Sequence, residues 1–379
     1  MAQRLKTDWT LFGTVLVMVL FGGVMIYSAS SMMAASRNNS AFYFALHQAI
    51  WIALAVPTMV WLKHLPYRKL QNTAVSFIPA GIVVVLLIAV YFLDAKQHRW
   101  LRFPGGGLQP SEFAKPALAL FLAYFMSIRG RAINSLYTLL PASLVVGLVT
   151  FAVVMADLGT AIVLVVMAGV VYFVAGLGWK QFVALTGVVF LGICVSVVVR
   201  PYRLCRVVVK FDPEFKLIDK VDKWGWVRGQ MAKSITTRDP SYQPLQARIA
   251  LGSGGPAGLG LMQGRQKLMY LPEAHTDEIY AVVGEELGLF GTVGLLVGFL
   301  VIGWRGIRAT MRAQDEFGKY LALSLTTLLV VQAFFNMTVV LDMIPTKGIP
   351  LPMISYGGSS LLATLISLGI LMNVSEHAS

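Results

Sequence analysis

Residues 271–288 read LPEAHTDEIYAVVGEELG and place acidic residues and a histidine directly before and within the start of a long apolar segment. Carboxylates are costly near the core of a bilayer, so an acidic cluster at the edge of an apolar segment indicates a functional site. Asp277 is the first candidate, because it stands where the polar motif meets the apolar run.

The composition of the whole chain indicates a membrane protein. Of its 379 residues, 57% are hydrophobic and 13% are charged, whereas a soluble globular chain typically has about 25% charged residues. Its apolar runs reach the length of about 20 residues that a transmembrane helix needs. The first run is followed by further runs, so we expect a retained helix rather than a cleaved signal peptide. We therefore predict a single polytopic membrane domain over residues 1–379.

The apolar runs predict an all-α protein with about ten transmembrane helices. The predicted spans are residues 10–32, 42–62, 73–93, 112–128, 137–155, 158–178, 181–199, 278–304, 319–341 and 357–374. A long loop, residues 200–277, separates the seventh span from the eighth.

The basic residues predict the orientation. With both termini in the cytoplasm, twelve Lys and Arg residues of the short loops lie inside and six lie outside, as the positive-inside rule favours. Lys63 is one of the twelve, and we expect it to act only through this bias. Long loops translocate largely regardless of their charge. The loop of residues 200–277 is therefore predicted to be extracytoplasmic.

This orientation gathers the unusual polar motifs on the extracytoplasmic side, where a cytoplasmic nucleotide is absent. No phosphate-binding G-x-x-x-x-G-K-[ST] motif is present, so the substrate must carry its own activation energy. The formal net charge of +13 is scattered through loops. It fits membrane phosphates better than nucleic acid. Cys194 and Cys205 form neither a metal-binding pattern nor a disulfide framework.

Six stretches resemble those of a known family. They are RW at 99–100, QPSEFAK at 109–115, DLGTA at 157–161, IALGSGG at 249–255, LPEAHTD at 271–277 and PTKGIPLPMISYGGSS at 345–360. The chain resembles the SEDS proteins (shape, elongation, division and sporulation) over nearly its whole length. The PTKG at 345–348 is similar to the division-type, FtsW-like branch rather than to the RodA-like branch. Departures from the family pattern are Met155-Ala156, Asp342 and an extended stretch at 214–239.

The resemblance implies a peptidoglycan glycosyltransferase of the bacterial inner membrane, acting at the division septum. Its substrate would be lipid II, a disaccharide-pentapeptide on undecaprenyl pyrophosphate, which is joined into β-1,4-linked glycan strands. The implied partners are a class B penicillin-binding protein (an FtsI-like transpeptidase) and bitopic divisome proteins like FtsQ, FtsL and FtsB. No nucleic acid is expected.

The implied reaction inverts the donor's anomeric carbon once, which requires a general base on the incoming 4-hydroxyl group. We predict that Asp277 is this base, because partial burial raises the basicity of a carboxylate. Glu273 and Glu278 are weaker candidates. Glu285 would sit about 12 Å deeper on a continuous helix, so we expect it to pair inside the bundle. The alternative is that Asp277 merely caps the next helix, a role that Thr276 can also fill.

Further side chains are predicted to bind the substrate: Glu112, Lys115, Arg99, Lys347, Ser355, Tyr356, Lys267, His275 and Thr276. Glu112 and Lys115 are three residues apart and can form an ion pair, which would satisfy a helix end or orient Asp277. Arg99-Trp100 can instead be an interfacial anchor. The Ser355–Ser360 stretch can instead be a structural turn. No protein metal site is predicted, and a Mg²⁺ or Mn²⁺ ion bridging the pyrophosphate remains open.

Two other function classes compete with the polymerase. A lipid II flippase would need charged groups near the bilayer midplane and usually inverted repeats. The midspan charges are few, mainly Glu285 and Glu286, and no internal repeat is evident. A structural scaffold would need no acidic motif. The sequence therefore favours the polymerase.

Overall fold

The computed structural model describes residues 7–38, 40–94, 99–103, 106–212, 222, 225, 229, 241–345 and 348–378. Each of the ten predicted spans coincides with a helix. These helices are α1 (Trp9–Asn38), α2 (Tyr43–His64), α3 (Thr73–Leu93), α4 (Pro110–Arg129), α5 (Leu136–Ala156), α6 (Leu158–Val174), α7 (Trp179–Val199), α12 (Ile279–Arg312), α13 (Glu316–Val340) and α14 (Gly358–His377).

Eight of these helices are long and apolar enough to cross a membrane. The other two are α6, which has 17 residues, and α4, which carries Glu112 and Lys115 in its first two turns. The predicted all-α membrane fold is therefore confirmed. Short 3-10 helices at Tyr67–Leu70 and Gly130–Ala132 connect neighbouring spans.

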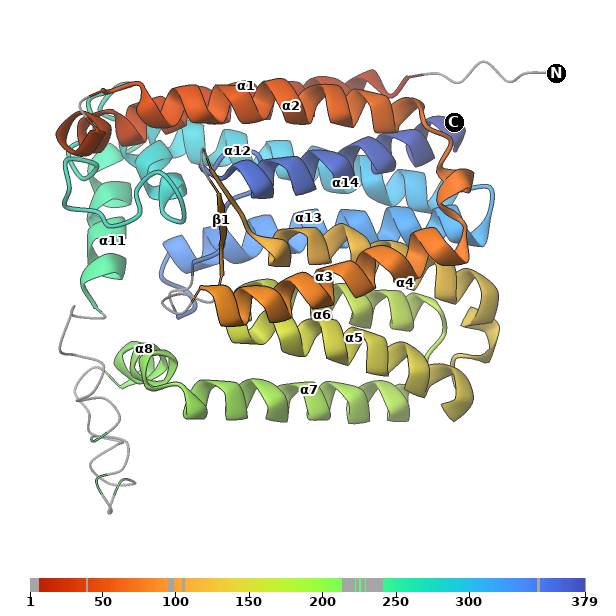
Figure 1. Ribbon diagram of the computed structural model, residues 1–379. Helices are drawn as coiled ribbons and strands as arrows, with labels where there is room; N and C mark the ends of the chain where they lie inside the picture. The colour runs from red at the N-terminus through yellow and green to blue at the C-terminus, as the bar shows by residue number, and fades with distance from the viewer. Residues whose placement is uncertain are drawn as a thin grey trace.

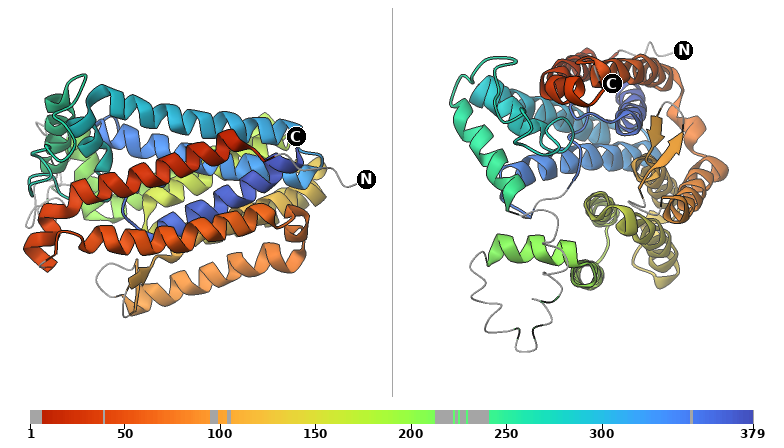
Figure 2. Two further views of the ribbon diagram at one scale, coloured as in Figure 1. Left: turned by 90° about the horizontal axis from the view of Figure 1, so that it is seen from above. Right: turned by 60° about the vertical axis from the view of Figure 1, so that its left-hand side comes forward.

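The centre of the bundle is formed by α4, α13 and α14. The helix α13 packs against α4 and α12, and α14 packs against α2. Helices that are apolar all round must be buried in protein or face lipid. Most residues of α14 are buried, whereas no residue of α7 is. The helix α7 therefore lies at the periphery (Figure 2) and presents its side chains to lipid.

Both termini lie at one end of the bundle (Figure 1), in agreement with the predicted arrangement. The opposite end carries the other connecting elements. They include a two-stranded antiparallel hairpin that was not predicted, with β1 (Leu101–Phe103) paired to β2 (Gly106–Leu108). The positive-inside rule predicts that the end with the termini is cytoplasmic, and the hairpin then lies on the predicted extracytoplasmic side.

The predicted long loop contains two helices that the apolar periodicity did not identify. They are α8 (Pro201–Phe211), which directly follows α7, and α11 (Tyr242–Gly254), which packs against α12. Both lie at the extracytoplasmic end (Figure 1). The extended stretch at 214–239 lies outside the described residues, apart from 222, 225 and 229.

A break at Gly288 divides α12, which the sequence predicted as one continuous span. Gly288 has φ 62° and ψ −153°, a left-handed conformation that glycine adopts without steric cost. A side chain there would overlap the backbone N of Gly258. The backbone N–H of Leu289 donates to the carbonyl of Gly255 (3.0 Å), so the loop satisfies a group that the break exposes. The part after the break is still long enough to span the bilayer.

At the end with the termini, buried and partly buried ion pairs join elements that are far apart in the sequence. Asp8 pairs with Arg305 of α12 (2.6 Å), and Lys63 of α2 pairs with Glu376 of α14 (2.9 Å). Lys63 is buried in the last turn of its helix. The expectation that Lys63 is a loop residue with a purely topological role is therefore wrong.

Candidate active site

The motif at residues 271–277 forms hydrogen-bonded turns rather than helix. The N–H groups of Thr276 and Glu278 both donate to the carbonyl of Glu273 (3.1 and 3.2 Å). The backbone of Glu273 has a positive φ of 54°. The N-cap residue of α12 is Glu278, and its side chain makes no capping hydrogen bond. The predicted cap is therefore not formed by Thr276 or by Asp277. The hydroxyl of Thr276 donates to the Glu273 carboxylate instead (2.9 Å).

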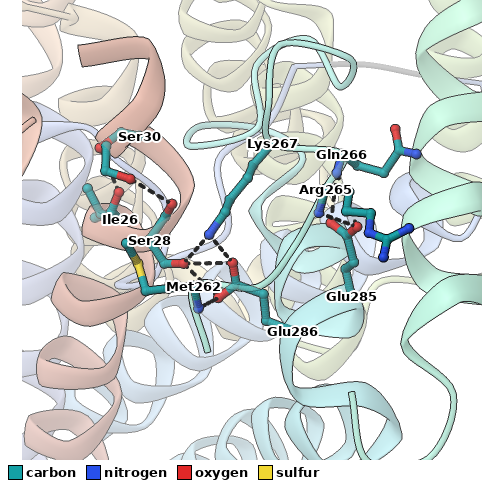
Figure 3. Close-up of polar contacts among 10 residues, drawn as sticks. Ile26, Ser28, Ser30, Met262, Arg265, Gln266, Lys267, Glu285 and Glu286 are labelled. Atoms are coloured by element: carbon teal, nitrogen blue, oxygen red, sulfur yellow. Dashed lines mark hydrogen bonds and ion pairs between the residues drawn. The ribbon is translucent and has the colours of Figure 1, made fainter. Parts of the chain in front are cut away.

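Glu286 anchors the preceding loop to the bundle (Figure 3). Its carboxylate accepts hydrogen bonds from the hydroxyl of Ser28 in α1 (2.7 and 2.6 Å) and from the N–H of Met262 (3.1 Å). The ammonium of Lys267 forms a 2.5 Å ion pair with the same carboxylate, and both side chains are buried. Lys267, predicted to bind substrate, is thus occupied by an internal partner.

Glu285 anchors the same loop through its backbone. Its carboxylate accepts from the N–H of Arg265 (2.7 Å) and from the N–H of Gln266 (3.1 and 3.2 Å), as Figure 3 shows. Glu285 is buried and has internal partners, but they are backbone groups of the loop rather than the side chains inside the bundle that were predicted. Together the two glutamates fix the residues that lead into the motif.

Asp277 is held by the segment that precedes α14, residues 348–357. The amide of Asn336 in α13 donates to the carbonyls of both Asp277 (2.8 Å) and Ile349 (2.7 Å). The N–H of Tyr356 donates to the carbonyl of His275 (2.9 Å). Gly348 lies directly against the Asp277 side chain, since a Cβ atom there would overlap Oδ2. The backbone of Asp277 is therefore tied to α13, and the backbone of Gly348 closes one side of its carboxylate.

A second polar group on α13 supports the same segment. Gln332, four residues before Asn336 and therefore on the same face of the helix, donates to the carbonyl of Pro350 (2.9 Å). Its amide oxygen accepts from Lys115 (2.7 Å), which also forms the predicted ion pair with Glu112 (2.7 Å). Lys115 is buried. It thus reaches the neighbourhood of Asp277 through Gln332.

Gln332 and Asn336 were missed by the sequence analysis. The available signal was the pair of amides four residues apart in the apolar run QAFFN, residues 332–336. Polar side chains in a membrane span usually face the bundle interior. The spacing of these two amides would therefore have predicted that both face inward.

The surroundings of Asp277 make its carboxyl group a suitable base. The side chain keeps some contact with solvent, but protein encloses it closely, and this burial raises its pKa to about 7. Arg99 and Arg206 lower the pKa, while Glu273 raises it. Burial likewise raises the pKa of Glu278 to about 7, and the charge of Asp277 adds to that rise.

Arg99 lies near the site at the end of the α3–β1 connection. Its guanidinium is 3.6 Å from the carboxylate of Asp157. Asp157 in turn caps α6, accepting from the N–H of Gly159 (2.9 Å) and the hydroxyl of Thr160 (2.6 Å). Trp100 lies close to Gly107 in the hairpin. Arg99 thus stays a substrate-binding candidate, and Trp100 packs within the hairpin region.

The remaining predicted residues have mixed positions. The rings of His275 and Tyr356 pack against Phe44, with centroids 4.7 and 5.1 Å away. The hydroxyl of Ser355 accepts from the N–H of Leu351 (2.7 Å), as the structural-turn alternative expected. Lys347 lies outside the described residues.

The fold and the site together define a polytopic, all-helical membrane protein with a closely held carboxylate at its extracytoplasmic face. The family model for the FtsW, RodA and SpoVE cell cycle proteins matches residues 8–379. This chain belongs to that family, and the resemblance noted from its motifs is confirmed.

Similar proteins agree with this assignment. The "Probable peptidoglycan glycosyltransferase FtsW" of Geobacter sp. (strain M18) is 37% identical over 95% of this chain and 94% of its own length. The stage V sporulation protein E of Bacillus subtilis (strain 168) is 33% identical over 99% of both chains. A solved chain described under "Structural coordination of polymerization and crosslinking by a peptidoglycan synthase complex" has a TM-score of 0.74, 26% identity and 99% coverage of both chains. Thermus thermophilus RodA shares the fold, with a TM-score of 0.66, 24% identity and coverage of 98% and 97%.

Proposed function

We propose that this protein is a peptidoglycan glycosyltransferase that polymerises lipid II on the outer face of the bacterial inner membrane, at the division septum. The observation that carries the proposal is the Asp277 carboxyl group, whose pKa burial raises to about 7 between the 271–278 turns and Gly348. The family assignment and relatives named peptidoglycan glycosyltransferase support the reaction class.

In the proposed reaction, Asp277 takes the proton from the 4-hydroxyl group of the acceptor sugar. The oxygen of that hydroxyl group forms a bond to the donor's anomeric carbon as the bond from that carbon to the diphosphate breaks. One inversion converts the α-linked donor into a β-1,4 linkage, and undecaprenyl diphosphate leaves. A positioned base of this kind typically contributes about 10²–10⁴-fold to the rate.

The leaving diphosphate needs positive charge. The described residues include no group of three or more His, Cys, Asp or Glu side chains arranged to hold a metal ion. A Mg²⁺ or Mn²⁺ ion at this site would therefore take its ligands mainly from the diphosphate.

The positions of Glu285 and Glu286 favour a polymerase over a lipid II flippase. These two carboxylates were the acidic groups that a transport path could have used. Instead they accept hydrogen bonds from the loop before the motif, which makes them anchors at the extracytoplasmic end.

We further propose a class B penicillin-binding protein as the partner that cross-links the strands, together with bitopic divisome proteins like FtsQ, FtsL and FtsB. One similar solved chain is described as part of a peptidoglycan synthase complex that coordinates polymerisation and crosslinking. This likeness supports a partner of that kind.

The test is polymerisation of labelled lipid II by the detergent-solubilised protein with its cognate transpeptidase, with cross-linking blocked by a β-lactam. Micelles have no sidedness, so chain formation remains measurable there and translocation does not. We expect strands from the wild type and none from Asp277→Asn, because an amide cannot accept the proton at neutral pH.

Glu273→Gln is the matched control, since Glu273 belongs to the same motif but is exposed. It should keep most of the activity. Strand synthesis by folded Asp277→Asn would sink the general-base assignment. Wild-type complex that makes no strands but moves lipid II across proteoliposome membranes would replace the polymerase by the flippase.

A further inference from the structure

The basic face of α8 is a feature that the proposed mechanism does not yet use. Arg203, Arg206 and Lys210 are spaced three and four residues apart and therefore share one face of the helix. Leu204, Val207, Val208 and Phe211 recur at the same helical spacing on another side. An amphipathic helix that combines a basic and an apolar face is typical of the membrane–water interface.

The position of α8 agrees with this sequence pattern. It directly follows α7, whose side chains face lipid, and lies at the extracytoplasmic end of the molecule (Figure 1). The phosphate groups of membrane lipids lie at this depth, and basic segments there attract them.

The basic face reaches three elements around the candidate active site. Arg203 donates to the carbonyl of Val154 at the end of α5 (2.7 Å). Arg206 donates to the amide of Gln243 in α11 (3.2 Å). Lys210 forms a 2.8 Å ion pair with Asp342 beyond the end of α13.

The contact through Gln243 leads directly to the catalytic motif. The amide nitrogen of Gln243 donates to the carboxylate of Glu278 (2.8 Å), the residue next to Asp277. The guanidinium of Arg206 is therefore one bridging side chain away from the residue beside the proposed base. On another side, Arg99 approaches Asp157, which immediately precedes α6.

Arg203 has the features of an anion-binding group. It is only partly exposed, and its hydrogen bonds go to the neutral oxygens of Val154 and Ser196. A guanidinium group can donate two parallel hydrogen bonds to the oxygens of one phosphate group. A diphosphate placed beside Asp157, Asp277 and Glu278 would be repelled unless such cations faced it.

We infer that Arg203 and Arg206 of α8, together with Arg99, form the subsite for the diphosphate of the polyprenyl-linked donor. The identity of this ligand rests on the proposed function. The polyprenyl chain extends along the lipid-facing side of α7. The three guanidinium groups hold the diphosphate beside Asp277 and balance the charge that grows on it as it leaves.

The test measures binding of undecaprenyl diphosphate to the full-length protein in neutral detergent, by thermophoresis. The double variant Arg203→Gln/Arg206→Gln should bind at least tenfold more weakly than the wild type. Arg203→Lys/Arg206→Lys should recover part of the affinity, since charge returns without the bidentate fork. Lys180→Gln, an exposed residue at the other end of α7, should bind as the wild type does.

Two results would overturn the inference. One is equal affinity in the wild type and the glutamine double variant. The other is equally strong competition by phosphatidylglycerol, which would make the face a general phospholipid contact. If the double variant does not fold, the subsite is tested on the wild type by modifying its arginines with phenylglyoxal. Undecaprenyl diphosphate should protect Arg203 and Arg206 but not the exposed Arg131, and absence of protection refutes the subsite.

Failure of this subsite can be told apart from failure of the proposed function. Asp277→Asn should bind undecaprenyl diphosphate at least as tightly as the wild type, because one negative charge beside the diphosphate is removed, while making no glycan strands. Strands from Asp277→Asn would refute the base but leave the binding result intact. Unchanged binding by the double variant would refute the subsite but leave the base intact.

Discussion

At the scale of the residue, the ionisation and the burial of Asp277 oppose each other. It must be ionised to accept a proton, yet burial favours its neutral form. Residues around it tune this balance in known directions, since Arg99 lowers its pKa and Glu273 raises it. Burial outweighs the effect of Arg99 and raises the pKa of this carboxyl group to about 7.

The pH dependence of polymerisation follows from this balance. The ionised fraction of Asp277 grows as the pH rises through about 7, so the initial rate should rise with pH and level off above it. Glu273→Gln removes a negative charge near Asp277 and should move the midpoint of the rate–pH profile to lower pH. Arg99→Gln should move it to higher pH. Initial rates of lipid II consumption across the pH range check both signs, and a flat profile would contradict the role of Asp277.

Gly348 is the second residue that the site requires. A methyl group there would overlap Oδ2 of Asp277, so Gly348→Ala should displace the base and lower the polymerisation rate at least tenfold. A displacement of about 1 Å can cost about 10²-fold in rate. Gly13→Ala in α1 meets no atom within 4 Å and is the matched control. Wild-type activity in folded Gly348→Ala would mean that the close approach has no functional role.

At the scale of the element, helices that are distant in the sequence are joined by buried polar pairs. Helix α13 supports the 348–357 segment through Gln332 and Asn336. Helix α1 is joined to α12 through Ser28 and Glu286. Such pairs fix the relative positions of helices whose apolar surfaces alone would allow them to slide.

The pair between α2 and α14 gives a stability prediction. Lys63→Met would leave Glu376 buried without this cation. Removing one partner of a buried pair typically costs about 3–5 kcal/mol. Thermal denaturation in detergent should show a clear loss of stability for Lys63→Met and a smaller loss of stability for Lys63→Met/Glu376→Met. Lys69→Met, at an exposed site on the same side, should change little. Equal stability of Lys63→Met and the wild type would show that the pair contributes nothing.

At the scale of the whole molecule, the mechanism depends on which side of the membrane holds Asp277. We expect a membrane-impermeant thiol reagent to label Ser241→Cys in spheroplasts but not Gln314→Cys. Both positions are exposed, one before α11 and the other between α12 and α13. The background lacks Cys194 and Cys205. The reverse labelling pattern would move Asp277 to the cytoplasm, where lipid II outside the cell could not reach it.

The sequence by itself determined the ten helices and the boundary position of Asp277, and it predicts their orientation. These features depend on local patterns, because an apolar run of about 20 residues must cross the bilayer wherever it occurs. The Glu112–Lys115 pair was predictable for the same reason, since its two residues lie within one helical turn.

Only the tertiary structure decided what surrounds Asp277. Asn336 is 59 residues away from it along the chain, and Ser28 is 258 residues away from Glu286. The break at Gly288, the paired state of Lys63 and the contact of Arg206 with Glu278 through Gln243 likewise depend on partners from other elements. Apolar patterning does not encode such contacts. They form where packing brings buried polar groups together, because each of those groups must find a partner away from water.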